Sequence, residues 1–446
     1  MALASALTLR YGALRLPLAL VDLLFVAALA LDLALAPAPR RLAVERDAPE
    51  ATGLSADLER TVRLDASAAG RRPAGRRVEV HEEFPASFEV LRRSVWGDEA
   101  PPQDGDPSGG PDLGAFAADG RLALRRVYRP TLRGAHALGD LRVRIRGPLG
   151  LIERQRRLRG EQIVAIEPAL ADLKNTLRLA ASERWQDLGV RRLRRRGGQT
   201  EFESLRDYVQ GDDPRRVDWK AFARRGKPTV RQYQEECGQE LILLLDCGRR
   251  MRTVASEGRH AGWTKLDWAL DSALQLAAVA LARGDRVGAL AFDQRVLAYV
   301  SPAKSARQLQ RLRESLFHLQ PSVGESDPER ALRELAARHR RRALVLVVSD
   351  VADPFSVPHQ RRALAAASRR HRVIFAALDD PGIRETALGQ STAASTRAAA
   401  YELMDDRRLA LRRLAGTGVR VLDAVPAEAA GPMLAAWLDE RRSLGG

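Results

Sequence analysis

The stretch Gly197–Met251 decides the fold of this 446-residue chain, and it reads GGQTEFESLRDYVQGDDPRRVDWKAFARRGKPTVRQYQEECGQELILLLDCGRRM. Near its end, the run Leu241–Leu245 is wholly apolar and is followed by Asp246. A short apolar run of this kind is typical of a strand that is buried on both faces of a parallel sheet. The part before it is dense in Asp, Arg and Trp, which is unusual for a simple connector. The stretch therefore joins a polar block to the first strand of an α/β domain.

The α/β pattern continues to the end of the chain. Four further strands are predicted at Val287–Phe292, Ala343–Ser349, Val373–Leu378 and Val419–Leu422. Helices are predicted between and after them at Lys265–Arg283, Ser305–Leu319, Pro328–Arg340, Pro358–Arg370, Glu402–Leu414 and Ala427–Arg441. Apolar strands that alternate with amphipathic helices indicate a parallel sheet covered on both faces. We assign this α/β domain to residues 237–446.

The first 236 residues divide into three further regions. Residues 1–40 contain the apolar run Leu16–Ala36, which is long enough to cross a bilayer although it includes Asp22 and Asp32. We expect a membrane anchor there, as one span, a hairpin or a surface helix. Residues 41–160 alternate apolar and polar positions between Gly/Pro-rich gaps, which predicts a small β-rich domain. Residues 161–236 form a basic segment followed by the polar block.

The basic residues are scattered along the chain, which argues against a specific nucleic-acid site. The net charge is +16, and only five of the 73 basic residues are Lys. Scattered Arg usually marks a solvated surface, and the densest patch, Arg191–Arg196, lacks the interleaved aromatics of a single-strand binding platform. Contact with phosphates or anionic headgroups stays open for this patch. Cys237 and Cys247 have neither a zinc-ligand nor a redox spacing.

Two predicted strands end in a carboxylate. Asp246 follows Leu245 and Asp350 follows Ser349, so in one parallel sheet their side chains would converge at the same edge. Divalent cations prefer such oxygen ligands, and Ser326 is a third candidate because it stands where a loop meets a helix. The simpler interpretations are strand-end carboxylates that bind loop amides, and a helix N-cap at Ser326 or Asp327 before Pro328.

The polar block resembles a known bacterial family. Thr200–Tyr208 and Gly211–Ala221 are similar to the signature of "domain of unknown function" family number 58, and Gly147–Leu151 resembles the upstream β-domain of that family. The Asp-terminated strand, the helix that opens at Lys265 and the Ser349-Asp350 strand end resemble the von Willebrand factor A fold. The resemblance implies a von Willebrand A-like α/β domain with a parallel-type sheet and helices on both faces. It also implies a preceding small β-rich domain and an N-terminal membrane segment.

The candidate metal site departs from the pattern of a metal-ion-dependent adhesion site. That site uses Asp-x-Ser-x-Ser, then a Thr and an Asp, but here Asp246 is followed by Cys247-Gly248-Arg249-Arg250. Both serines are missing, Ser326 stands at the Thr position, and Arg250 could bring a guanidinium to Asp246 and Asp350. We expect a degenerate site at Asp246, Ser326 and Asp350 that binds metal weakly or not at all. No cofactor is expected, and Mg²⁺ is disfavoured.

The signature block has two interpretations. Gly211-Asp212-Asp213-Pro214 is a turn sequence, and the surrounding Asp and Arg residues can form an ion-pair lattice around Trp219. The lattice would act as a latch between domains or as a docking surface for a partner. The candidate signature and docking residues are Glu201, Arg206, Tyr208, Gly211, Asp212, Asp213, Arg215, Asp218, Trp219, Arg224 and Arg250.

These observations favour a non-enzymatic protein. The chain has no Gly-x-x-x-x-Gly-Lys phosphate loop, no His-Glu-x-x-His and no Gly-x-Ser-x-Gly. The resemblance implies a membrane-anchored adaptor or scaffold that partners a MoxR-type AAA+ ATPase in chaperone-like assembly or maturation. Its expected location is the bacterial inner membrane, with the soluble domains in the cytoplasm. The alternatives are a metal-dependent hydrolase that uses Asp246, Asp350 and Asp293, and a basic nucleic-acid-binding protein.

Overall fold

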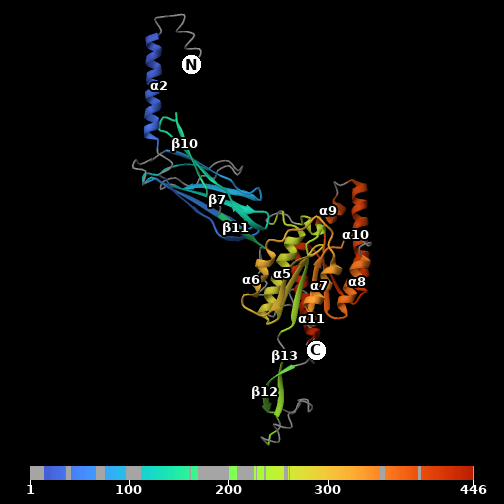
Figure 1. Cartoon of the computed structure of the whole chain (residues 1–446). Helices are drawn as coiled ribbons and strands as arrows, with labels where there is room; N and C mark the ends of the chain where they lie inside the picture. The colour runs from blue at the N-terminus through green and yellow to red at the C-terminus, as the bar shows by residue number, and fades with distance from the viewer. Residues whose placement is uncertain are drawn as a thin grey trace. The chain divides into compact units, whose positions relative to one another are not determined.

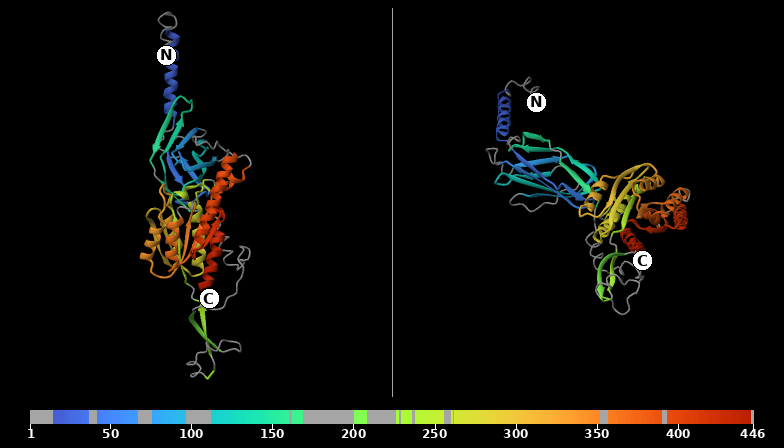
Figure 2. Two further views of the ribbon diagram at one scale, coloured as in Figure 1. Left: turned by 90° about the vertical axis from the view of Figure 1, so that its right-hand side faces the viewer. Right: turned by 60° about the horizontal axis from the view of Figure 1, so that its bottom comes forward.

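The computed structural model divides the chain into two compact units, Met1–Glu167 and Pro168–Gly446 (Figure 1, Figure 2). It describes residues 15–36, 42–66, 76–96, 112–159, 162–168, 200–207, 226–227, 229–235, 238–255, 260, 262–351, 357–389 and 393–444. Each unit has its own core, so each is described by itself.

Unit 1 is built from short β strands. They are β1 (Ala43–Asp47), β2 (Ala51–Gly53), β3 (Leu58–Asp65), β4 (Arg77–Glu82), β5 (Phe88–Trp96), β6 (Asp112–Ala115), β7 (Arg121–Pro130), β8 (Gly134–Leu138), β9 (Leu141–Arg146), β10 (Glu153–Leu158) and β11 (Gln162–Glu167). They form sheets in the orders β1-β3-β7-β5, β10-β9-β4-β6 and β2-β11-β8. All pairs are antiparallel except β11 with β2.

The core of unit 1 follows from the two-residue period of its strands. Val62 on β3 lies opposite Leu124 on β7, and both side chains are fully buried together with Val143 and Ile145 of β9. A polar cluster is buried in the same unit, where Arg60 pairs with Glu82 and with Asp112. Buried charges are tolerated when they are paired in this way.

The first helix, α2 (Arg15–Leu35), is anchored through Asp32 to a loop of unit 1. The Asp32 carboxylate accepts hydrogen bonds from the backbone N–H groups of Leu149 at 2.7 Å, Leu151 at 2.9 Å and Ile152 at 2.8 Å. Burial alone would raise the pKa of Asp32, but these three donors and the nearby Arg76 lower it below its ordinary value. A Cβ on Gly147 would overlap the Asp32 carboxylate, so the loop approaches this closely only because residue 147 is Gly.

The structure does not support the predicted N-terminal membrane segment, so this part of the predicted fold class is wrong. Among the helices of the described residues, none is long and apolar enough to cross a membrane. The prediction treated Leu16–Ala36 as one apolar run, whereas Asp32 near its end is held by polar contacts of the β unit. The expected location at the inner membrane is not tested and stays a prediction.

Unit 2 contains a β hairpin and a six-stranded sheet. The hairpin pairs β12 (Thr200–Asp207) with β13 (Thr229–Glu235). The sheet contains β14 (Glu240–Asp246), β15 (Arg286–Phe292), β16 (Val296–Ala303), β17 (Leu344–Ser349), β18 (Arg372–Leu378) and β19 (Arg420–Ala424), in the order β16-β15-β14-β17-β18-β19. Five of these strands are parallel, and β16 runs antiparallel to β15 at one edge.

The parallel-type sheet of the prediction is therefore corrected to a mixed one. Strand β16 was not among the predicted strands, although it starts with the short apolar run Val296–Val300; its side chains are mostly half-buried. The hairpin that leads into β16 turns at Asp293, whose Oδ1 accepts the N–H of Arg295 at 2.9 Å. Such a side-chain contact is a usual way for Asp to stabilise a tight turn.

Helices cover both faces of the sheet. They are η6 (Arg249–Arg252), α5 (Lys265–Ala282), α6 (Gln308–Leu316), α7 (Pro328–Arg338), α8 (Val357–Ser368), α9 (Pro381–Leu388), α10 (Ala394–Ala415), η8 (Pro426–Glu428) and α11 (Ala430–Leu444). Leu243 and Leu245 of β14 face α5, α6 and α11, whereas Ile242 and Leu244 face α7, α8 and α10. This alternation explains why the strand is apolar at every position.

Candidate functional site at the carboxyl edge of the sheet

The sheet brings Asp246 and Asp350 to the same edge. Asp246 is the last residue of β14, and Asp350 directly follows β17. The two strands are adjacent and parallel, with Leu245 in register with Val348. Both carboxylates are buried, with 4% of Asp246 and 6% of Asp350 exposed. Their convergence follows from the topology of parallel strands.

Both oxygens of the Asp246 carboxylate accept hydrogen bonds from the protein. The N–H of Gly248 donates to Oδ1 at 2.7 Å, and the hydroxyls of Ser326 and Ser349 donate to Oδ2 at 2.9 Å and 2.5 Å. Burial raises the pKa of Asp246, and the charge of Asp350 acts in the same direction. The three donors work against this rise because they stabilise the ionised form.

Gly248 permits the close approach of the loop that carries Ser326. A Cβ at position 248 would lie 2.9 Å from Ser326 Oγ and 3.0 Å from Ser326 N. The backbone of Gly248 is extended, so the requirement for Gly is steric and not conformational. The helix N-cap of α7 is Asp327, which accepts the N–H of Arg330, and Ser326 is left to contact Asp246.

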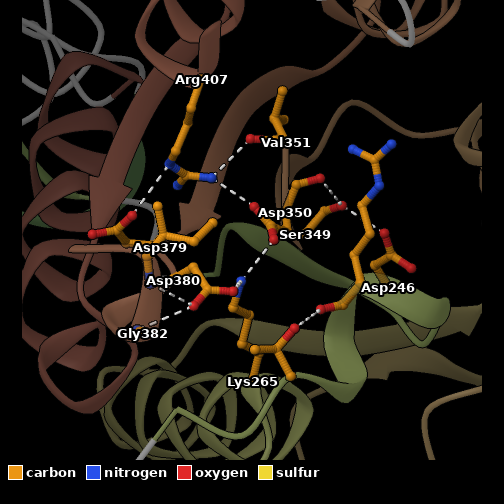
Figure 3. Close-up of polar contacts among 12 residues, drawn as sticks. Asp246, Lys265, Ser349, Asp350, Val351, Asp379, Asp380, Gly382 and Arg407 are labelled. Atoms are coloured by element: carbon orange, nitrogen blue, oxygen red, sulfur yellow. Dashed lines mark hydrogen bonds and ion pairs between the residues drawn. The ribbon is translucent and has the colours of Figure 1, made fainter. Parts of the chain in front are cut away.

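Lys265 is the first cation that contacts Asp350 (Figure 3). Its Nζ lies 2.8 Å from Asp350 Oδ2 and 3.0 Å from Asp380 Oδ2, and only 1% of the Lys265 side chain is exposed. Lys265 is the first residue of α5, which starts with a capping box between Thr264 and Asp267. This cap determines where the helix begins and so places Lys265 next to the end of β17.

Arg407 of α10 is the second cation at Asp350 (Figure 3). Its Nη1 donates to Asp350 Oδ1 at 2.6 Å and to the carbonyl of Val351 at 2.9 Å. Its Nη2 donates to Asp423 Oδ1 at 2.9 Å, and its Nε lies 3.5 Å from Asp379 Oδ1. Burial would lower the pKa of Arg407, but the surrounding carboxylates raise it overall, so this guanidinium stays charged.

Arg250 was expected to bring its guanidinium to Asp246 and Asp350, but the ion pairs of Asp350 are with other residues. Arg250 Nε lies 3.7 Å from Glu325 Oε2, and Arg249 pairs with the same carboxylate. The cations at Asp350 are Lys265 and Arg407, which the sequence analysis did not consider for this role. One signal was available for Lys265, since the chain has few Lys residues and this one follows a helix-cap sequence. Arg407 is one of many Arg residues and carried no such signal.

The donor set does not fit a divalent cation in this arrangement. Both oxygens of Asp350 contact protein cations, and both oxygens of Asp246 accept protein hydrogen bonds. A metal would have to displace the ammonium of Lys265, which lies where its charge would be needed. Among the described residues, no group of three His, Cys, Asp or Glu side chains could hold a metal ion.

Most of the predicted signature residues lie outside the described residues. Glu201 and Arg206 lie on β12. The patch Arg191–Arg196 is also outside the described residues, together with Tyr208, Gly211, Asp212, Asp213, Arg215, Asp218, Trp219 and Arg224. The choice between a latch and a docking surface for this block therefore stays a prediction.

Fold and site together define an α/β domain in which a closed network of ion pairs and hydrogen bonds fills the carboxyl edge. Residues 204–413 match the family described as protein of unknown function DUF58. The resemblance seen in the signature block is thus confirmed at the level of the family.

The relatives do not carry an assigned function. Uncharacterized proteins of Mycobacterium tuberculosis and Mycobacterium bovis are each 31% identical over 177 residues. The match covers 39% of this chain, and the chain spans about half (53%) of the length of these curated relatives.

Two solved structures show weak similarity to part of the chain. BatB from Bacteroides thetaiotaomicron has a TM-score of 0.31 and 14% identity, and an aerotolerance-related membrane protein from Bacteroides fragilis has 0.29 and 13%. Each comparison covers 46% of this chain and 100% of the other. Both TM-scores are too low to bear on fold or function.

Proposed function

We propose that this protein is a non-enzymatic adaptor and that the carboxyl edge of its six-stranded sheet binds a partner protein. The partner that the family resemblance implies is a MoxR-type AAA+ ATPase, acting in chaperone-like assembly or maturation. The adaptor would present a surface to the ATPase, and the ATPase would supply the nucleotide chemistry.

The observation that supports this proposal is the saturation of the edge carboxylates. Each oxygen of Asp246 and Asp350 already has a donor or a cation from the protein within hydrogen-bond distance. A general base or a metal ligand needs an accessible lone pair, and these carboxylates are buried with every oxygen already in contact with a protein donor or cation. A network of this kind instead makes the edge rigid, which favours recognition by a partner.

The rim of the same edge exposes the mixture of groups that protein interfaces use. Val323 is 79% exposed, and its loop is tied to the segment after β14 by backbone bonds from Ser322 N to Cys247 O and from Arg249 N to Gly324 O. The Arg249–Glu325 ion pair is exposed beside it. An apolar anchor on a fixed loop with a charged border matches the usual anatomy of an interface.

The alternative functions have less support. In a hydrolase Asp293 would assist Asp246 and Asp350, but Asp293 Oδ1 accepts the N–H of Arg295 within the β15–β16 hairpin. The nucleic-acid alternative depends on Arg191–Arg196, which lies outside the described residues. Neither alternative has an observation that favours it over the adaptor.

The proposal is tested by measuring binding of the full chain to a purified MoxR-type ATPase from the same organism. Val323→Glu places a charge on the proposed rim, and we expect it to weaken binding at least about tenfold, which is about 1.4 kcal/mol. Ile163→Glu is the matched control, because Ile163 is also exposed but lies on β11 of unit 1. Absence of binding by the wild-type chain, or equal loss in both variants, would refute the proposal.

A further inference from the structure

The opposite edge of the same sheet, where its parallel strands begin, contains a pocket. Its volume is about 330 Å³, and its lining includes Arg342, Ser368, His371, Arg372, Arg420 and Glu440. Arg342 precedes β17, Arg372 begins β18 and Arg420 begins β19. These three strands are adjacent and parallel, so the topology places the three Arg residues side by side.

The lining of the pocket carries more positive than negative charge. Three guanidiniums face one carboxylate, that of Glu440, in the lining. Arg420 is partly neutralised because its Nη2 lies 2.9 Å from Asp439 Oδ2 outside the lining. Among the residues that the structure describes, neither Arg342 nor Arg372 forms a side-chain ion pair, and both are exposed. Two guanidiniums are therefore available to an anion.

His371 adds a donor that has no partner within the described part of the chain. Its Nδ1 accepts the backbone N–H of Ala343 at 3.3 Å, so the neutral ring carries its proton on Nε2. Only 4% of His371 is exposed, and its buried Nε2 has no hydrogen-bond partner among the residues that the structure describes. Burial, together with His339 and Arg370, lowers the pKa of His371 to about 4, so the ring stays neutral at physiological pH. A buried N–H without an acceptor is unfavourable, and an oxygen of a ligand would satisfy it.

We propose that this pocket binds a phosphate group, either free or as part of a small phosphate monoester. Guanidiniums bind phosphate oxygens in pairs, and Arg342 and Arg372 supply two guanidiniums that have no ion-pair partner among the described residues. The volume is at the lower end of small-molecule sites, so the pocket suits a ligand no larger than a mononucleotide. The Ser368 hydroxyl donates to the carbonyl of Ala365 and remains available as an acceptor for the ester part of the ligand.

This site is independent of the proposed adaptor edge. It lies at the opposite ends of the strands and shares no residue with the Asp246 and Asp350 network. Failure of ATPase binding would therefore leave this proposal untouched, and failure of phosphate binding would leave the adaptor proposal untouched.

The test is calorimetric titration of the full chain with inorganic phosphate, AMP and adenosine at physiological ionic strength. We expect saturable binding of phosphate or AMP at one site and no binding of adenosine. AMP that binds more tightly than phosphate would assign the pocket to a monoester, and the reverse would assign it to free phosphate. No saturable binding of either anion would overturn the proposal.

Variants separate this pocket from the general basic charge of the chain. Arg342→Gln and Arg372→Gln should each weaken binding at least about tenfold, because each removes an unpaired guanidinium from the lining. Arg369→Gln is the matched control: Arg369 is exposed close to His371 in sequence but is not part of the lining. All three positions are exposed, so the variants should fold, which thermal unfolding verifies. Equal weakening by the control would show nonspecific attraction and refute the site.

Discussion

Lys265 Nζ lies 2.8 Å from Asp350 Oδ2, although 85 residues separate the two along the chain. Lys265 opens helix α5 and Asp350 follows strand β17, so the contact joins two elements on the carboxyl side of the sheet. The second carboxylate at the ammonium, Asp380, is the N-cap of α9 and accepts the N–H of Gly382 at 3.1 Å. One buried Lys thus connects the start of α5, the end of β17 and the start of α9.

Removing this charge should destabilise the protein strongly. Lys265→Met keeps most of the side-chain volume but leaves Asp350 and Asp380 without their shared cation. Loss of one partner from a buried ion pair costs about 3–5 kcal/mol of the free energy of unfolding, as urea denaturation would measure. Lys304→Met is the control, since Lys304 is exposed, and should change stability by no more than about 0.5 kcal/mol. Similar small effects for both variants would mean that the Lys265 pair contributes little.

Removing the ammonium should also create affinity for a divalent cation. In Lys265→Ala, Oδ2 of Asp350 and Oδ2 of Asp380 lose their cation and become available as oxygen ligands. Mn²⁺ should then raise the Tm of the variant, since a ligand at 100 times its Kd adds about 2.7 kcal/mol, whereas Mg²⁺ or Mn²⁺ should leave the wild-type Tm unchanged. The double variant Lys265→Ala/Asp350→Asn should lose the response. A Mn²⁺-dependent shift in the wild-type protein would contradict this assignment.

Gly248 offers a test of the contact between Asp246 and Ser326. Gly248→Ala introduces a Cβ 2.9 Å from Ser326 Oγ and 3.0 Å from Ser326 N, so the loop must move. Overpacking of this kind typically costs about 1–3 kcal/mol of the free energy of unfolding. Gly416→Ala is a suitable comparison, because its new Cβ would come no closer than 3.7 Å to the neighbouring atoms and its φ is −67°. If chemical denaturation gives the same stability for both variants, the close approach at Gly248 is not needed.

His371 should make stability depend on pH. Its pKa is lowered by burial, His339 and Arg370 from 6.5 to about 4, so the unfolded chain binds a proton at a higher pH than the folded one does. The unfolded state therefore binds more protons in this window, and stability falls as the pH drops from 6.5 towards 4. His371→Asn keeps an acceptor for the N–H of Ala343 but removes the titration.

The measurement is the free energy of unfolding by urea across this pH range for both proteins. Carboxyl groups that titrate in the same window contribute equally to both, so their effect cancels in the difference. The wild-type protein should lose more stability on acidification than His371→Asn. Parallel curves would show that the imidazole does not titrate differently in the folded state.

The strands of the α/β unit were predictable because their signal is local. The runs at Leu241–Leu245 and Val373–Leu378 lie within β14 and β18, since a strand buried on both faces must be apolar at every position. Strand β16 was not predicted, although its first five residues, Val296–Val300, are apolar; it is an edge strand whose side chains are mostly half-buried. The prediction of a membrane segment was wrong because it rested on the average apolarity of Leu16–Ala36. That average did not reveal that the Asp32 carboxylate accepts a hydrogen bond from the loop around Leu149.

Sequence alone determined the family, the positions of the buried strands and the presence of an Asp at two of their ends. The strands and their terminal Asp residues follow from local apolar patterns, and the family follows from the resemblance of Thr200–Tyr208 and Gly211–Ala221. Tertiary structure alone decided which cations contact Asp350, because Lys265 and Arg407 reach it from helices far along the chain. It also decided that three Arg residues before or at the starts of adjacent strands line one pocket. A contact between distant segments depends on how the layers pack, and no local pattern in a single sequence encodes that geometry.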